Sequence, residues 1–120
     1  MSDMVHTVLV IEDEEDLREM IRDGLELSGY NVVTAEEGQD ALDQIPRIQH
    51  LCLVLLDLMM PGMDGWDFLE QMRQRPELAG VPVVVHSSMT QSAPRGATRV
   101  LQKPTLFGQL LSVVQDYCTK

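Results

Sequence analysis

The chain has no apolar run near the roughly 20 residues that a membrane-spanning helix needs. Its first residues, Met1 to Met4, lack the basic segment and the apolar stretch of a secretory signal peptide. Apolar residues make up 44% of the 120 positions, which is ordinary for a soluble globular domain. We therefore expect a cytoplasmic protein without a membrane partner, folded as one domain over residues 1–120.

Basic residues are also scarce. Nine lysines and arginines stand against 19 acids, and the formal net charge is -10. This charge repels the phosphates of nucleic acids and anionic lipids, so we expect no direct binding to nucleic acid. A basic partner surface or a bound cation would suit it, although acidic composition also serves solubility. Composition alone leaves these explanations open.

Cysteine occurs only twice. Cys52 lies in an apolar run and Cys118 lies near the C-terminus. The positions favour two buried or half-buried thiols over a disulfide or a metal motif.

Short apolar runs alternate with segments of helical periodicity along the chain. The pattern predicts strands near 8–11, 31–35, 51–56, 83–85 and 100–101, and helices near 17–28, 41–45, 66–73 and 106–117. Strands that alternate with helices in this way imply right-handed crossovers and a parallel sheet covered on both faces. The expected fold is therefore a doubly wound α/β domain.

Polar residues follow four of the predicted strands. Glu12 and Asp13 come after the first, Asp57 after the third, Ser87 with Ser88 after the fourth, and Lys103 soon after the fifth. Ligands of open parallel sheets bind outside the carboxyl ends of the strands. Three carboxylates, a hydroxyl and an ammonium group should therefore converge at one edge.

Each of these residues also has an ordinary structural explanation. The acids at 12–16 could start a helix, with Asp13 as the cap and residues 14–16 facing the positive end of the helix dipole. Asp57 could be a buried, hydrogen-bonded carboxylate, and Lys103 an exposed lysine. Taken together, however, clustered carboxylates favour a hard cation, for which Mg²⁺ is expected. A carboxylate nucleophile, a divalent metal, a lysine and a hydroxyl are what phosphoryl transfer to an aspartate requires.

Four motifs carry a resemblance that extends over the whole chain. They are Val10-Ile11-Glu12-Asp13-Glu14, the stretch from Leu55 to Gly65 (LLDLMMPGMDG), the stretch from Pro82 to Ser88 (PVVVHSS), and Lys103-Pro104. In this order they resemble the receiver domain of two-component response regulators, including its chemotaxis-regulator-like members. The resemblance implies a five-stranded flavodoxin-like sheet of order 2-1-3-4-5.

The resemblance also implies roles for individual residues. Asp57 would accept the phosphoryl group, Asp13 and Asp57 would bind Mg²⁺ directly, Glu12 would bind it through water, and Met59 would supply a backbone carbonyl. The donor would be a sensor histidine kinase or a phosphotransfer protein, and a downstream protein would read the result. The domain would be a switch and not an enzyme acting on other substrates.

Two further residues would contact the phosphoryl group. Ser87 would donate its hydroxyl to one phosphoryl oxygen, and Lys103 would pair with another. The Lys103–Pro104 peptide bond is similar to one that is cis in the family. His86 is expected to be a hydrogen-bonded, half-buried ring, and Trp66 to pack at the start of the third helix.

The sequence departs from the family in two places. Val100 replaces the usual aromatic residue three positions before the lysine, and Ser, Gly and Pro residues between Ser87 and Lys103 predict a much reduced fourth helix. We expect phosphorylation to reorder residues 88–98 instead. Phe107 and Leu111 lie off the inward stripe of the last helix, which comprises Leu106, Leu110, Val113, Val114 and Tyr117. They suggest an uncovered apolar patch for a partner or for self-association.

Two other functions compete with the phosphoacceptor switch. The first is a phosphorylation-independent interaction module with the same fold, which the departures at residues 88–98 and Val100 would favour. The second is a magnesium phosphatase with an aspartyl intermediate, which would normally carry a second acid two residues after the nucleophile. Met59 occupies that place.

Overall fold

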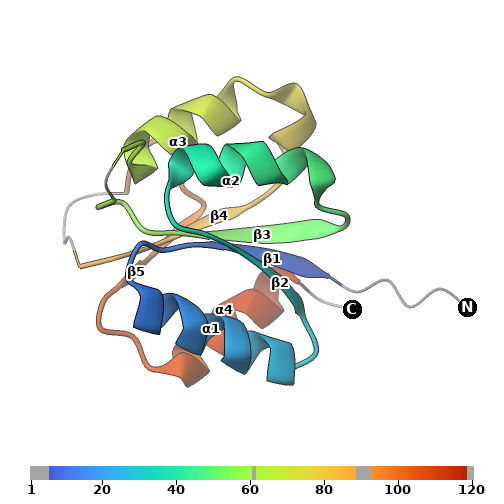
Figure 1. Ribbon diagram of the computed structural model, residues 1–120, viewed down its shortest axis with the longest axis vertical. Coiled ribbons are helices and arrows are strands. Elements are labelled where there is room, and N and C mark those ends of the chain that lie inside the picture. Colours follow the sequence, from blue (N-terminus) through green and yellow to red (C-terminus); the bar gives the residue numbers. More distant parts are fainter. Residues whose placement is uncertain (1–5, 61, 89–92, 119–120) are drawn as a thin grey trace, which may run out of the picture.

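The computed structural model describes residues 6–60, 62–88 and 93–118. Five parallel strands form one sheet in the order β2-β1-β3-β4-β5 (Figure 1). In chain order they are β1 (Thr7–Ile11), β2 (Asn31–Ala35), β3 (Leu51–Leu56), β4 (Val83–Ser87) and β5 (Arg99–Gln102). The predicted doubly wound fold and its strand order are confirmed.

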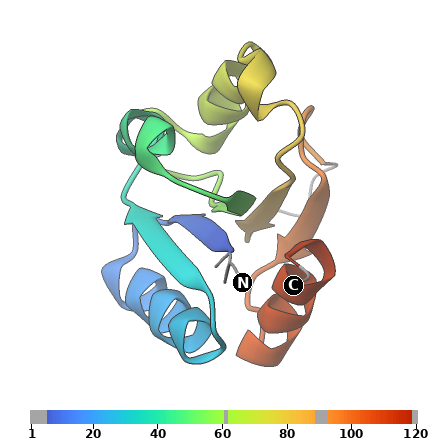
Figure 2. The same ribbon diagram turned by 90° about the vertical axis from the view of Figure 1, so that its right-hand side faces the viewer.

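Helices cover both faces of the sheet (Figures 1 and 2). One face carries α1 (Glu15–Leu27) and α4 (Phe107–Tyr117), and the other carries α2 (Gly38–Gln44) and α3 (Gly65–Arg73). Two 3₁₀ turns, Ile45–Arg47 and Pro76–Leu78, follow α2 and α3. The inner strands read as unbroken apolar runs because each face packs on its own helical layer. No helix of the described residues is both long and apolar enough to cross a membrane.

Helix α1 ends as predicted but begins differently. Gly29 follows its end with a φ of 97°, the left-handed conformation that favours glycine. The N-cap residue is Glu14, and its side chain makes no capping hydrogen bond, so the alternative explanation of Asp13 as the cap of this helix is wrong. Arg18 instead donates to the backbone carbonyls of Glu12 at 2.9 Å and Asp13 at 3.4 Å. The loop is held by this arginine, and the Asp13 side chain stays exposed.

The segment before β5 bears out the reduced fourth helix. Among the residues described between β4 and β5, none is helical; residues 89–92, part of the expected switch segment, lie outside the description. Gly96 has a φ of 98°, within a turn. Thr98 donates its backbone N–H to the carbonyl of Val83 at 2.7 Å and accepts from the N–H of Val83 at 3.0 Å through its hydroxyl. The described end of this segment is thus fastened to β4.

The start of α4 corrects two predictions. Leu106 is 76% exposed and precedes the helix as its N-cap, so it does not belong to the inward stripe. Phe107 packs over Gly24 of α1 so closely that a Cβ on that glycine would lie 2.4 Å from the ring atom Cζ. Leu111 is half-buried against the same core. The predicted uncovered patch at Phe107 and Leu111 was therefore wrong.

Helix α3 also differs in detail from its prediction. Asp64 caps it by accepting the backbone N–H of Asp67 at 3.0 Å. Phe68 is fully buried, whereas Trp66 is 39% exposed. The packing role expected of the tryptophan belongs to the phenylalanine.

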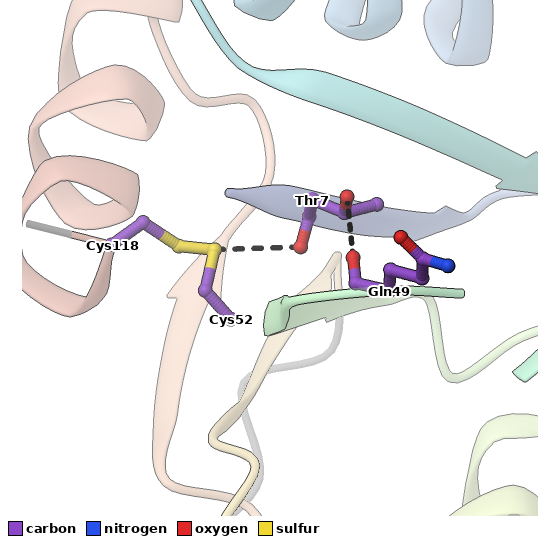
Figure 3. Close-up of a disulfide and its surroundings, with 4 residues drawn as sticks. All are labelled: Thr7, Gln49, Cys52 and Cys118. Carbon is purple, nitrogen blue, oxygen red and sulfur yellow. Dashed lines mark hydrogen bonds between the residues drawn. A yellow bond between two sulfur atoms is a disulfide. The ribbon is translucent and has the colours of Figure 1, made fainter. Parts of the chain in front are cut away.

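The two cysteines form a disulfide, which corrects the prediction of two thiols. Cys52 at the start of β3 is bonded to Cys118 at the end of α4, with their Cα atoms 5.5 Å apart (Figure 3). The fold brings the last turn of α4 beside the first residues of β3, a proximity between positions 66 residues apart. Local sequence pattern carries no signal of it.

Candidate functional site

Three carboxylates gather at the carboxyl edge of the sheet, directly after β1 and β3. Glu12 is 3% exposed and Asp57 is 6% exposed, whereas Asp13 is exposed to solvent. Each offers a carboxylate oxygen, and these oxygens lie within 4.8 Å of one another. The predicted convergence of Glu12, Asp13 and Asp57 is therefore present in the folded chain.

Lys103 reaches this cluster from the end of β5. Its Nζ donates to Oε1 of Glu12 at 2.8 Å and lies 3.7 Å from Oδ2 of Asp57. The backbone N–H of Lys103 donates to the carbonyl of Ser87 at 2.8 Å, which continues the β4–β5 ladder beyond the strand. The Lys103–Pro104 bond is cis, as the family resemblance implied.

Backbone N–H groups orient two of the carboxylates. The N–H of Glu14 donates to Oε2 of Glu12 at 3.2 Å, and that of Met59 donates to Oδ1 of Asp57 at 3.2 Å. The carboxylates of Glu12 and Asp57 thus each have one oxygen near a backbone donor and the other near the Lys103 ammonium group. The described contact of Met59 is through its N–H, so a role for its carbonyl stays a prediction.

Burial dominates the electrostatics of the cluster. It raises the pKa of Glu12 to about 7, with the negative charge of Asp57 adding to the effect and the hydrogen bond from Lys103 opposing it. Burial also raises the pKa of Asp57, again against the charge of Lys103. Burial lowers the pKa of Lys103, but its hydrogen bond to Glu12 and the nearby carboxylate charges outweigh this and the pKa is raised.

The cluster carries more negative than positive charge. When all are ionised, three carboxylates surround one ammonium group, which leaves two negative charges in a partly dry site. Hard oxygen ligands at this spacing suit a small divalent cation such as Mg²⁺. The donor set fits such an ion in both charge and ligand type.

Ser87 lies at the end of β4 with only 1% of its surface exposed. Its neighbour His86 differs from its prediction. The ring is 5% exposed, and its Nε2 has no hydrogen-bond partner in the described part of the chain. Burial, and secondarily the charge of Lys103, lowers the pKa of His86 to about 4. The expectation of a hydrogen-bonded ring was therefore wrong at this nitrogen.

A doubly wound domain with carboxylates and one lysine at the carboxyl edge of its sheet belongs to the class of α/β proteins that bind ligands at that edge. A family model described as the response regulator receiver domain matches residues 8–115. The chain belongs to this family and is a receiver domain of two-component response regulators. Such domains are signalling switches, not conventional enzymes, and they generally bind Mg²⁺.

Two relatives of the chain differ in length. The transcriptional regulatory protein HprR of Escherichia coli K12 is 31% identical over 111 residues, which cover 90% of this chain and 49% of HprR. The polar-differentiation response regulator DivK of Brucella ovis is 25% identical over 95% of this chain and 97% of DivK. The chain therefore spans about half the length of HprR, 35–41% of several other transcriptional regulators that it matches, and nearly all of DivK.

The solved structures agree with the sequence relatives. The chemotaxis response regulator CheY4 of Vibrio cholerae has a TM-score of 0.86 and 26% identity, with 96% of this chain and 100% of CheY4 covered. A response regulator of Chloroflexus aurantiacus has a TM-score of 0.85 and 27% identity, with 95% and 98% covered.

Proposed function

We propose that this receiver domain is a phosphoacceptor switch in which Asp57 receives a phosphoryl group. The observation that supports the proposal best is the environment of Asp57. This carboxylate directly follows the central strand β3, is 6% exposed, lies 3.7 Å from an ammonium group and has oxygens of two further carboxylates within 4.8 Å. A carboxylate that served only to cap a strand would not need these neighbours.

The transfer is a displacement at phosphorus. An Asp57 carboxylate oxygen attacks the phosphorus atom of a phosphohistidine on a sensor kinase or a phosphotransfer protein. The phosphorus–nitrogen bond breaks, the histidine nitrogen keeps the electron pair, and Asp57 becomes an acyl phosphate. Lys103 then stands beside the new phosphoryl oxygens, and Ser87 can donate its hydroxyl to one of them. Attack of water on the phosphorus atom later restores the carboxylate and releases inorganic phosphate.

Glu12, Asp13 and Asp57 are the residues that would hold Mg²⁺, with a ligand from the Met59 carbonyl. The ion supplies charge neutralisation for the phosphoryl oxygens. The protein's own contribution is geometric, since backbone N–H groups and Lys103 hold Glu12 and Asp57 before any donor arrives.

The expected setting is a cytoplasmic signalling pathway with one receiver domain over residues 1–120. A histidine kinase or phosphotransfer protein would supply the phosphoryl group, and a downstream protein would read it. Direct binding to nucleic acid is not expected of a domain with net charge -10. The names of HprR and DivK indicate different outputs, transcriptional regulation and polar differentiation. These relatives therefore do not identify the output of this chain.

The signal would leave the site through residues 88–98, which follow Ser87 directly. Val100 is half-buried against the α2 and α3 layer and offers no aromatic ring to rotate. The end of the segment is anchored to Val83, so rearrangement should concentrate nearer Ser88. Hydrogen exchange with and without a stable phosphoryl mimic should show altered protection here. Changes confined to other segments would contradict this route.

Intact mass after incubation with a small phosphodonor and Mg²⁺ tests the proposed function. The wild type should gain one phosphate, labile in base, and Asp57→Asn should gain none because an amide is a far weaker nucleophile than a carboxylate. Asp67→Asn is the matched control, since Asp67 is a nearby exposed acid on α3. Labelling that survives Asp57→Asn would disprove the assignment. An unlabelled wild type would favour the phosphorylation-independent interaction module.

A further inference from the structure

The disulfide lies at the opposite end of the sheet from the carboxylate cluster. Cys52 is the second residue of β3, and Asp57 follows the last residue of the same strand. Cys118 is the C-cap residue of α4, the last helix of the fold. The bond therefore joins the final turn of the last helix to the beginning of the central strand (Figure 3).

An irregularity in the sheet orients Cys52 toward α4. Thr7 of β1 pairs with Leu51 of β3, but Val8 pairs with Leu53, so the register skips Cys52. Successive residues of a regular strand face opposite sides, yet Leu53 and Cys52 both pack in the layer under α1 and α4. A bulge of this kind re-aims a side chain. Without it, Cys52 would face α2 and α3, away from Cys118.

The same structure can also accommodate Cys52 and Cys118 as free thiols. The Sγ of Cys52 lies 3.4 Å from the backbone carbonyl oxygen of Thr7, a contact drawn in Figure 3. A disulfide sulfur carries no hydrogen, but a thiol at this position can donate its S–H to that oxygen. Cys118 is 1% exposed within the apolar layer, where a free thiol is well accommodated.

We propose that Cys52 and Cys118 form a reversible redox site that fastens the end of α4 to β3 when oxidised and releases it when reduced. In the oxidising direction, two protein thiols lose two electrons and two protons to a low-molecular-weight disulfide such as glutathione disulfide. That reagent leaves as two thiols, and the protein gains one sulfur–sulfur bond. Exchange begins at Cys52, which is half-buried, whereas Cys118 is almost fully covered.

Release would act on the last turn of α4. In the reduced protein this turn keeps the backbone hydrogen bond from the N–H of Cys118 to the carbonyl of Val114 at 2.8 Å, together with its apolar contacts. It loses the covalent link that closes a 66-residue separation. The redox site thus sets how firmly the C-terminal end of the domain is held, and it does so whether or not Asp57 is phosphorylated.

Equilibration of the wild-type protein with graded ratios of reduced to oxidised glutathione tests the proposal. Free thiols are trapped by alkylation and counted by intact mass. The expected result is a single transition between two free thiols and none, with the same midpoint when approached from either side. The absence of a disulfide in the most oxidising buffer would overturn the site. A bond that persists in folded protein in the most reducing buffer would overturn its reversibility.

Hydrogen exchange on the two forms tests the consequence. Reduction should speed exchange in residues 113–118 about tenfold, because the last turn can open without the cross-link. Cys118→Ser should exchange like the reduced wild type in either buffer, since it cannot form the bond. Equal exchange of oxidised and reduced wild type across residues 113–118 would contradict the release of α4.

Discussion

Acidification should destabilise the folded chain through the buried ring of His86. In the folded protein burial lowers the pKa of this ring from 6.5 to about 4. Between these values the unfolded chain takes up a proton and the folded chain does not, so stability falls as the pH falls. Well above pH 6.5 the ring is neutral in both states and causes no loss of unfolding free energy. The full loss is present only below about pH 4.

The shift sets the size of the effect. At pH 7 both states are mostly neutral at this ring, and the loss of unfolding free energy is close to zero. At pH 5 the unfolded ring is mostly protonated and the folded ring mostly neutral, which corresponds to about 2 kcal/mol. The limiting loss, for a displacement from 6.5 to about 4, is about 3 kcal/mol.

Urea unfolding of the wild type and His86→Leu at pH 7 and pH 5 measures this quantity. The stability of the variant relative to the wild type should rise by about 2 kcal/mol on going to pH 5, because leucine takes up no proton in either state. Packing differences between the two side chains cancel, since they do not depend on pH. The acids of the cluster are common to both proteins, and His6→Gln controls for loss of an imidazole outside the core. A stability difference that is the same at both pH values would refute the reasoning.

Two further predictions concern the cluster. Mg²⁺ should raise the melting temperature of the wild type. Asp13→Ala should remove most of that gain while Asp16→Ala keeps it, because Asp13, unlike Asp16, belongs to the group of carboxylates found with Glu12 and Asp57 among the described residues. Equal shifts in both variants would count against the site. Lys103→Ala should bind Mg²⁺ as well or slightly better by titration, since a competing positive charge is gone, yet show a weaker spectral response to phosphorylation. An undiminished response would exclude the proposed role of the lysine.

The strands were predictable because their signal is local. The apolar runs gave β2 and β3 their observed bounds, and the polar residues after the strands placed Glu12, Asp13, Asp57 and Lys103 at one edge. Parallel strands meet at the same edge, so the convergence follows from the fold class alone.

Other features depend on contacts that the local pattern does not encode. β3 is apolar on both faces, so its sequence does not reveal that a register shift turns Cys52 toward α4. Helical periodicity predicted that Leu106 faces inward and Phe107 outward, whereas Leu106 is exposed and Phe107 packs on α1. The pattern of α4 does not show that α1 carries a glycine opposite the ring of Phe107. Among the described residues Nε2 of His86 has no hydrogen-bond partner, which is likewise a property of its surroundings, since the residue type alone favours a hydrogen-bonded ring.

The contact between Gly24 and Phe107 interlocks helices α1 and α4. A glycine inside a helix weakens it by roughly 0.5–1 kcal/mol relative to alanine, so the position is costly unless the missing side chain serves a purpose. Here the ring fills the gap, and α1 and α4 are interlocked at that point. Phe107 begins α4 only four residues after Lys103, so the contact lies at the start of the helix that follows the lysine. A residue larger than glycine at position 24 would therefore have to displace this ring before α1 and α4 could pack together.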